Sequence, residues 1–447
     1  MTKIIKKILE LDKMTWKILQ NWMNKDSAQE FSHKLTAWFF WEVIGNSLRN
    51  QEQFTHHKYI KKHVFKNTSI LYKFLKLKLK NSQCLGKKKI FLPIIDKNTL
   101  MIASILIDSG EFNIFLPRYH SFFVRNYNSQ FLYETLGEMK KFLKTNKIFL
   151  NSGKWLEILK RLKYTLSVFH YAVNDLRKIK PDLVVVSGDN YSPYQEYIFA
   201  AKKLGIKTMM LQHGLGCERY HDYHFTDFMN IWGEKQKEKY KDYKGGLRVT
   251  GNLFFEGFFV PRKINSDGDY YLWITRPHTI GKCYLPSRLP SEGIKIAGAL
   301  QNISKNKNIL VIIKPHPYDY VSPYKKIIKN QNLVKIKMEN LYSLIKNSKA
   351  VISEDSTAAL EAMFFGKPII HVHFAQSYPV LKLVKYGAAL PGFSQKQLFD
   401  SIEKIEKRSF NENKMLKGQI NFIKDYAGPL TGTQKNIINF IKEVVYG

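Results

Sequence analysis

Two short segments in the second half of the chain combine residue types that can bind a phosphate group. In the first, Lys314 and His316 follow an apolar run, and prolines flank His316 on both sides. In the second, the polar residues Ser353 to Thr357 follow another apolar run and precede a helical pattern. Cations at strand ends and the unpaired N–H groups of a first helical turn both attract negative charge. We therefore expect the two segments to form the floor of a nucleotide site.

Each side chain in these segments has an expected task. Ser356 and Thr357 can cap a helix and donate hydroxyl hydrogen bonds to phosphate oxygens. Lys314 or His316 can place positive charge, or a proton, where a leaving phosphate becomes negative. Glu361 lies about one helical turn further on, where its carboxylate can accept hydrogen bonds from a ribose. The expected nucleotide-binding residues are Lys314, His316, Ser353, Ser356, Thr357, Glu361 and Arg276.

At these residues the sequence resembles the GT-B glycosyltransferases that build bacterial surface polysaccharides. Lys314 to Pro317 is similar to the basic-x-His-Pro motif of CDP-glycerol glycerophosphotransferases, polysialyltransferases and capsule synthesis enzymes. Ser353 to Thr357 resembles the Ser/Thr motif that follows in those families. Glu361 to Ile370 is similar to the Glu-Ala-Met…Gly-x-Pro-Val-Ile segment of many retaining GT-B enzymes. Those enzymes carry a second glutamate eight residues earlier, where this chain has Ser353, so the resemblance favours the His-Pro families.

The resemblance covers roughly residues 88–445 in layout, and it implies catalytic roles for His213, Asp189 and His316. His213 resembles the histidine of the His-Gly segment in glycerophosphotransferases, and Asp189 stands where an acid can orient it. Both follow expected strands of the first half, at an inter-domain cleft where a base must meet the acceptor hydroxyl. Histidine titrates near neutral pH, and a desolvated aspartate can also act as a base. Either residue can instead be part of an ordinary turn or helix cap.

Three further features have weaker or divided interpretations. Arg276 ends an expected strand and either approaches the donor phosphate or belongs to a turn. The segment Asp267 to Asp269 has the Asp-x-Asp pattern of metal-dependent GT-A enzymes, but it precedes a strand, so we favour a turn and expect no metal. His371 and His373 lie on an apolar strand, where they either belong to the core or line the cleft.

Composition limits the classes of protein that need to be considered. A chain of 447 residues with 44% hydrophobic content is large enough for two or three domains. Cys84, Cys217 and Cys283 lie far apart, which indicates neither a disulfide framework nor a structural zinc site. We find no signal peptide, and no apolar run approaches the ~18 residues that span a bilayer. We therefore expect a cytoplasmic protein that can also contact the inner face of the membrane.

The formal net charge of +34 has more than one explanation. Residues 1–90 hold 19 Lys plus Arg against 6 Asp plus Glu, and Ile4, Ile8, Leu11 and Ile18 recur there at helical spacing. This composition is typical of a basic amphipathic helix on an anionic membrane. The same helix can instead pack on a neighbouring domain, and biased amino-acid usage can account for the charge. No nucleic-acid-binding motif is present, so we do not expect a nucleic-acid partner.

Strand and helix patterns alternate through both halves of the chain. We expect strands at residues 90–95, 112–116, 182–187, 207–212, 230–232, 247–250, 270–275, 309–313, 333–336, 350–353 and 368–372. Helical patterns between them include 100–107 and 193–204, and helices resume from about residue 395. This alternation predicts parallel, doubly wound sheets. The polar, turn-rich stretch 261–269 is the expected linker between domains.

The sequence thus predicts an α/β protein of the GT-B class, with two doubly wound Rossmann-like domains facing a cleft and an N-terminal helical appendage. Its expected parts are a basic appendage (1–87), an acceptor domain (88–260), a nucleotide-donor domain (269–425) and a terminal helix (426–447) that packs back across the domains. The expected reaction is metal-independent, inverting transfer of a sugar or phosphoalditol from a nucleotide-activated donor to a surface-polysaccharide or lipid-linked acceptor, without a cofactor. The alternatives are an enzyme like the UDP-GlcNAc 2-epimerases of this fold and a non-catalytic GT-B scaffold.

Overall fold

The computed structural model describes most of the chain from residue 86 onward. The described residues are 86–117, 140, 144, 152–188, 193–212, 214–215, 225–240, 243, 245–276, 290–316, 319, 321–328, 331–374, 379 and 381–447. The expected basic appendage and its amphipathic helix therefore lie almost wholly outside the described residues. Within them, no helix has an apolar stretch of the length and hydropathy that crossing a bilayer requires.

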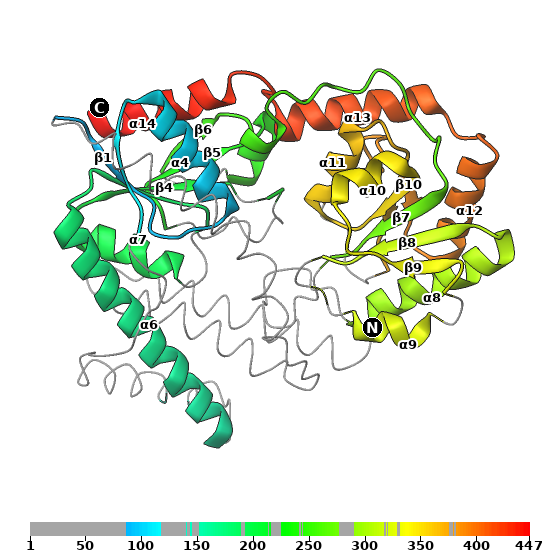
Figure 1. The fold of residues 1–447 in the computed structure, drawn as a ribbon, viewed down its shortest axis with the longest axis horizontal. Coiled ribbons are helices and arrows are strands. Elements are labelled where there is room, and N and C mark those ends of the chain that lie inside the picture. The colour runs from blue at the N-terminus through cyan, green and yellow to red at the C-terminus, as the bar shows by residue number, and fades with distance from the viewer. Residues whose placement is uncertain are drawn as a thin grey trace.

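The first half of the described chain is built on a six-stranded parallel sheet (Figure 1). Its strands are β1 (Lys89–Phe91), β2 (Asn113–Phe115), β3 (Leu183–Val186), β4 (Lys207–Leu211), β5 (Phe228–Ile231) and β6 (Gly246–Val249). Their spatial order is β2-β1-β3-β4-β5-β6. The order reverses between β1 and β3, and ligands of open α/β sheets bind at such a switch point, outside the carboxyl ends of the strands.

Helices cover both faces of this first sheet. One face packs against α4 (Lys97–Ser109) and α14 (Thr433–Tyr446), and the other packs against α6 (Ser152–Ile179) and α7 (Tyr194–Lys203). Val184 and Val185 show why the strands are continuous apolar runs. These neighbours on β3 point to opposite faces, and both are fully buried, each in a different core.

The second half is built on another six-stranded parallel sheet. Its strands are β7 (Tyr270–Ile274), β8 (Leu310–Lys314), β9 (Val334–Ile336), β10 (Ser348–Ser353), β11 (Ile369–Val372) and β12 (Leu390–Gly392). They lie in the order β12-β11-β10-β7-β8-β9, so the switch point of this sheet lies between β7 and β10. One face packs against α10 (Leu341–Asn347), α11 (Thr357–Phe364) and α13 (Glu412–Ala427). The other packs against α8 (Pro290–Lys307), α9 (Ser322–Ile327) and α12 (Gln395–Glu406).

The two halves are connected twice. The chain first passes through irregular backbone at residues 256–269, and α13 and α14 then run along one side of the molecule from the second sheet to the first (Figure 1). Gly251 lies where the returning chain passes: its φ is +90°, and a Cβ there would be 2.3 Å from the Pro429 carbonyl oxygen. Only glycine combines that conformation with that close approach.

The predicted fold class, with two doubly wound parallel sheets, is confirmed, while several element boundaries were wrong. Most strands are shorter than expected, and the strand expected at residues 230–232 begins at Phe228. Three short elements were not predicted: β12, α9 and α10, which have three, six and seven residues. Elements of that length contain too few residues to show a helical or strand period.

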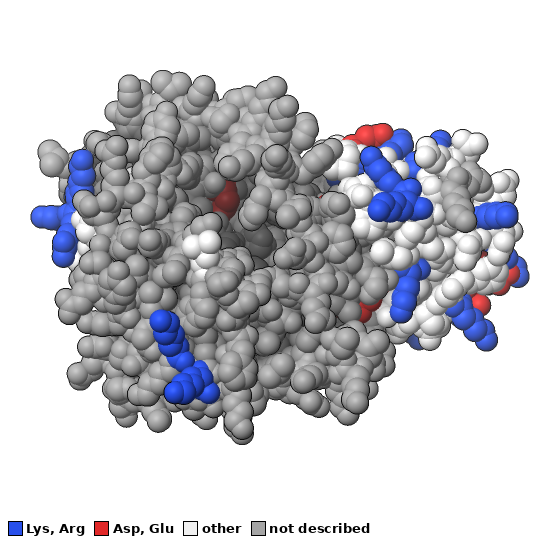
Figure 2. Space-filling model, turned by 90° about the horizontal axis from the view of Figure 1, so that it is seen from below, with Lys and Arg blue, Asp and Glu red and all other residues white. Residues whose placement is uncertain are grey.

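The positive charge is dispersed over the described part of the face in Figure 2. Lys and Arg side chains there stand in several separate small groups, and Asp and Glu side chains lie beside some of them. The described residues of this face therefore form several small basic groups instead of one continuous basic surface.

Candidate functional site

The clearest candidate site lies at the carboxyl ends of β10, β7 and β8, which are neighbours in the second sheet. The register pairs Ser353 with Ile274 and Ile274 with Lys314. The polar residues that follow these three strands therefore meet at one edge, beside the switch point. The two segments singled out in the sequence are thus brought together, with the strand that ends before Arg276 between them.

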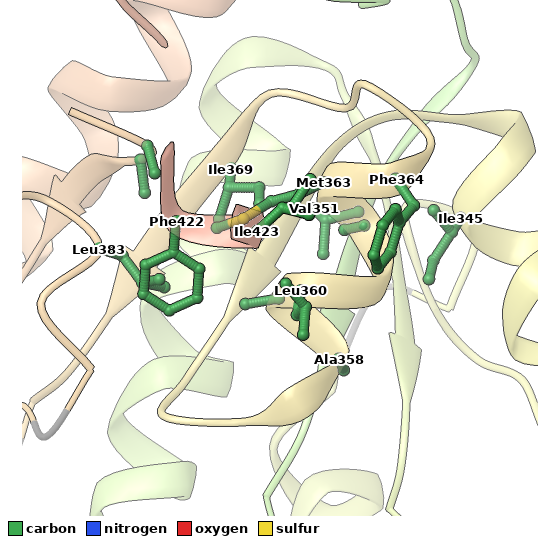
Figure 3. Close-up of a cluster of buried hydrophobic side chains, with 14 of the residues drawn as sticks. Ile345, Val351, Ala358, Leu360, Met363, Phe364, Ile369, Leu383, Phe422 and Ile423 are labelled. Carbon is green, nitrogen blue, oxygen red and sulfur yellow. The ribbon is translucent and has the colours of Figure 1, made fainter. Parts of the chain in front are cut away.

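Helix α11 begins at this edge and is firmly anchored. Ser356 is its N-cap and accepts a hydrogen bond from the Ala358 N–H at 3.2 Å. Figure 3 shows Leu360, Met363 and Phe364 among the buried side chains of the sheet and of α13. This packing fixes the first turn, whose unpaired N–H groups carry partial positive charge.

Lys314, the last residue of β8, places an ammonium group on the same face of the sheet. Ile312, two residues earlier, points into the core that contains α11, and alternate residues of a strand share a face. Lys314 is half-buried, and its Nζ lies 3.5 Å from the Pro315 carbonyl oxygen. Burial lowers the pKa of Lys314 below its usual 10.5. No carboxylate of the described residues lies within 4 Å of it.

The His316 backbone is fixed by the neighbouring strand end. Its N–H donates to the Thr275 hydroxyl oxygen at 3.0 Å, and its carbonyl accepts from the Asp319 N–H at 2.8 Å. At the switch point itself, the Arg276 N–H donates to Glu354 Oε2 at 3.2 Å. The predicted residues Lys314, His316 and Arg276 therefore stand at the ends of the neighbouring strands β8 and β7, on the edge of the sheet where α11 follows β10.

Ser353 and Glu361 lie close to α11 in different environments. Ser353 is fully buried, and its hydroxyl donates to the Glu354 carbonyl at 3.0 Å. This bond stabilises the backbone at the end of β10. Glu361 is half-buried near Tyr342 of α10. Desolvation, with a smaller contribution from the Glu361 charge, raises the pKa of Tyr342 to about 12.

A buried histidine–aspartate group behind α11 was only partly foreseen. His371 is fully buried, and its Nε2 lies 3.1 Å from Asp355 Oδ1, while the Nδ1 of His373 lies 3.6 Å from Asp355 Oδ2. The Leu381 N–H also donates to Asp355 at 2.9 Å. These contacts fix the residue just before the Ser356 cap. The alternation of His371 and His373 was the available signal; their partner could not be identified without the sheet order.

The first sheet approaches the candidate site at the end of β4. The Leu215 N–H lies 3.5 Å from Thr357 Oγ1, and a Cβ on Gly214 would lie 3.5 Å from the same atom. Leu215 also belongs to the buried cluster that contains α11. The first residue of α11 thus faces a loop of the other half. His213 and Asp189, the predicted catalytic residues of that half, lie outside the described residues.

Buried amides hold that loop in place. Gln212 accepts from the Trp232 N–H at 2.8 Å and donates to the Gly214 carbonyl at 2.6 Å and to the Gln236 side chain. Gln236, in the 3₁₀ helix Glu234–Tyr240, donates to the Tyr426 carbonyl at 2.9 Å. The network therefore links the end of β4 to α13, which packs on α11.

Asp96 lies at the switch point of the first sheet and was not among the predicted site residues. Asp96 is the N-cap of α4 and forms a capping box with Thr99. Its Oδ2 also accepts close hydrogen bonds from the buried hydroxyls of Ser187, just after β3, and Tyr194. The capping pattern of an acid three residues before a threonine was the available signal. Among the described residues, no group of three or more His, Cys, Asp or Glu could hold a metal ion.

The sequence matches no protein-family model and no curated protein. Solved structures are similar in fold. UDP-GlcNAc 2-epimerase from Neisseria meningitidis, bound to UDP-GlcNAc, is 15% identical with a TM-score of 0.51, over 80% of this chain and 100% of that one. UDP-GlcNAc 2-epimerase from Methanocaldococcus jannaschii is 16% identical with a TM-score of 0.47, over 81% and 100%. A glycosyltransferase from Rickettsia africae is 12% identical with a TM-score of 0.47, over 80% and 99%.

The sheet orders and the similarity to the Neisseria structure establish the architecture. It consists of two six-stranded parallel sheets flanked by helices. The terminal helix returns to pack on the first sheet. The chain has the two-domain α/β GT-B fold.

Proposed function

We propose that the chain is a glycosyltransferase that moves a sugar, or a related phosphoalditol unit, from a nucleotide-activated donor to a surface-polysaccharide or lipid-linked acceptor. The observation that carries this proposal is Lys314. Its half-buried ammonium has a lowered pKa and no carboxylate within 4 Å among the described residues, so a bound anion would stabilise its charged form. It stands at the edge where α/β folds bind ligands, beside the α11 first turn.

The proposed donor site uses the groups around that edge. Lys314 and the N-terminus of α11 hold the phosphate, with Ser356 and Thr357 at the first turn of the helix. Arg276 approaches from the end of β7. Glu361, further along α11, is the proposed ribose partner. A monophosphate or a diphosphate donor fits these cations, and the ligand panel below distinguishes the two.

The proposed reaction is a direct displacement. The acceptor hydroxyl loses its proton to His213 or Asp189, and its oxygen attacks the donor carbon that bears the phosphate. In sugar transfer the bond between that carbon and the phosphate oxygen breaks, and the nucleotide leaves with the electron pair. In phosphoalditol transfer the acceptor oxygen attacks the phosphorus of the alditol phosphate instead, the bond from that phosphorus to the bridging oxygen of the diphosphate breaks, and the nucleoside monophosphate leaves with the electron pair. Lys314, His316 and the α11 N-terminus stabilise the negative charge of the departing phosphate. Fixed protein cations thus supply the charge that a metal ion supplies in other transferases.

The contact between Leu215 and Thr357 supports a shared active site. It brings Leu215, two residues after His213 in the loop that follows β4, to the first residue of the proposed donor helix. A base on that loop would then meet an acceptor next to the donor phosphate. Contact with an anionic membrane, where a lipid-linked acceptor resides, is proposed from the basic residues 1–90.

A ligand-dependent thermal-shift panel tests the proposal. CMP, CDP, UDP, GDP and ADP are compared on wild type, Lys314→Met, His316→Ala and the control Lys335→Met, which removes an exposed lysine of β9. A nucleotide at 100 times its Kd stabilises the folded state by about 2.7 kcal/mol, about 3 °C for a chain of this size. We expect that shift for one nucleotide in wild type and the control, and its loss in the two site variants.

Two outcomes would contradict the proposal. No shift with any nucleotide at millimolar concentration would favour a scaffold role. If the matching nucleotide sugar is bound but converted without any acceptor, the chain is an epimerase of the same fold. Product analysis with and without acceptor glycan separates that result from transfer.

A further inference from the structure

A buried carboxylate holds the His316 turn from behind. Asp319 is 7% exposed, and its Oδ2 accepts hydrogen bonds from two hydroxyls, a close one from Thr275 and one from Tyr324 at 2.9 Å. Thr275 and Tyr324 are both fully buried. A charged group is rarely buried this deeply without a specific task.

Thr275 connects this carboxylate to His316. Its hydroxyl has a single hydrogen, which it donates to Asp319, so its lone pair is oriented to accept the His316 N–H at 3.0 Å. The Asp319 N–H in turn donates to the His316 carbonyl at 2.8 Å. Asp319 therefore fixes His316 at both backbone polar groups, once directly and once through Thr275.

Tyr324 donates the second hydrogen bond to the same carboxylate. It belongs to α9, and its ring packs edge-on against Trp273 with centroids 5.5 Å apart. The two hydroxyls are alike in that both donate to Asp319 Oδ2 and both belong to fully buried residues. The Thr275 hydroxyl also accepts the His316 N–H and so connects the carboxylate to the proposed donor site.

We infer that Asp319 and Thr275 are positioning residues of the donor site, which set the place of the His316 imidazole relative to the donor phosphate. This inference rests on the proposed function, since it assumes that His316 meets the donor. A charge-stabilising group must be held within a fraction of an ångström to act fully. The Thr275 bridge ties His316 to β7, the strand between β8 and β10, and so to the strand ends that carry Arg276 and α11.

Two single-hydroxyl deletions test this inference. Thr275→Val and Tyr324→Phe each remove one donor from the same buried oxygen, so a purely structural role predicts similar losses of stability and similar nucleotide affinity. A positioning role predicts a difference: Thr275→Val weakens nucleotide binding about tenfold, as loss of one hydrogen bond of about 1.4 kcal/mol would do, while Tyr324→Phe stays within about twofold. Thr275→Ser, which keeps the hydroxyl, should restore wild-type affinity.

Isothermal titration with the nucleotide found for wild type gives the Kd values, and urea unfolding gives the stabilities. If wild type binds no nucleotide, the proposed function fails, and this inference, which rests on it, fails with it. If wild type binds and His316→Ala loses affinity, but Thr275→Val binds like wild type or exactly as Tyr324→Phe does, the function stands and this inference is overturned. Should Thr275→Val not fold, Thr275→Ser and Asp319→Asn supply the comparison, with Asp319→Asn expected to be the weaker binder.

Discussion

At the carboxyl ends of its strands, the second sheet places Lys314, Arg276 and the N-terminus of α11, whereas the first sheet places the Asp96 carboxylate and the Gln212 amide. Both edges hold a switch point of the same type of fold. The second edge has a half-buried cation without a carboxylate within 4 Å among the described residues. At the first edge, two of the described polar groups are bonded within the protein, Asp96 to two hydroxyls and Gln212 to Trp232 and Gln236.

The two edges therefore suit different tasks, anion binding at the second and support of a loop at the first. The half-buried ammonium of Lys314 favours an anion at the second edge, as proposed above. The amides around Gln212 are bonded to one another and to backbone groups, so they give a rigid base for a loop. The first edge therefore holds the β4 loop in place, and the loop in turn meets Thr357 at the second edge.

The largest expected effect concerns the core that joins the two edges. Leu360→Ala empties a fully buried position in the cluster that also contains Leu215, Trp232 and Phe255 of the first half. We expect the free energy of unfolding to fall by about 2–5 kcal/mol, in one transition for both halves because they share this core. Urea unfolding followed by circular dichroism and tryptophan fluorescence measures it. Leu156→Ala, at a 53% exposed position of α6, should change stability by less than about 0.5 kcal/mol. Two separate transitions would show that the halves fold independently.

The next largest effect is expected from removing the positive charge at the second edge. Lys314→Met keeps the aliphatic chain and removes the ammonium, so nucleotide affinity should fall about 10- to 150-fold, the range for a charge-assisted hydrogen bond of about 1.5–3 kcal/mol. Removing a half-buried charge should leave stability unchanged or raise it. Titration calorimetry with Lys335→Met as control measures the first effect. An unchanged Kd in Lys314→Met would assign the anion to other groups.

The sheets were predictable because their strands are buried on both faces. Continuous runs such as Val184–Val186 and Val351–Ser353 indicate central parallel strands without any knowledge of the partner. The three-residue β12 and the seven-residue α10 carry no such signal and depend on packing in the folded chain.

The site was predictable where its residues are close in sequence, and less so where the fold brings distant segments together. Lys314 and Thr357 were singled out from local motifs as candidates, and the strand order places both at one edge of the second sheet, as the rule for strand ends predicts. The link between Thr275 and Asp319, like the one between Asp96 and Ser187, joins residues 44 and 91 positions apart. No local pattern in a single sequence reveals such pairs.

The N-cap residues of two helices allow the two edges to be compared directly. Ser356 caps α11 at the second edge, and Asp96 caps α4 at the first. Ser356→Ala and Asp96→Ala should each lower the free energy of unfolding by about 1 kcal/mol, Asp96→Ala by more because two further hydroxyls lose their acceptor. Only Ser356→Ala should also weaken nucleotide binding, a few-fold, since the first turn of α11 loses its orientation. Equal effects of the two variants on Kd would remove the distinction between the edges.

The smallest effect is a pH dependence that belongs to the second edge alone. Because burial lowers the pKa of Lys314 below 10.5, the folded chain releases this proton at a lower pH than the unfolded chain does. Between the two pKa values the unfolded state binds more protons, so stability rises with pH there. The bound phosphate prefers the charged ammonium, which raises the Lys314 pKa again. Nucleotide affinity should therefore fall as pH rises through the lowered pKa, and binding at alkaline pH should take up protons. Calorimetry in two buffers of different ionisation enthalpy measures the uptake, and Lys314→Met should abolish it. An uptake that persists in Lys314→Met would belong to another group, and the charge at the end of β8 would then not be the one that the ligand meets.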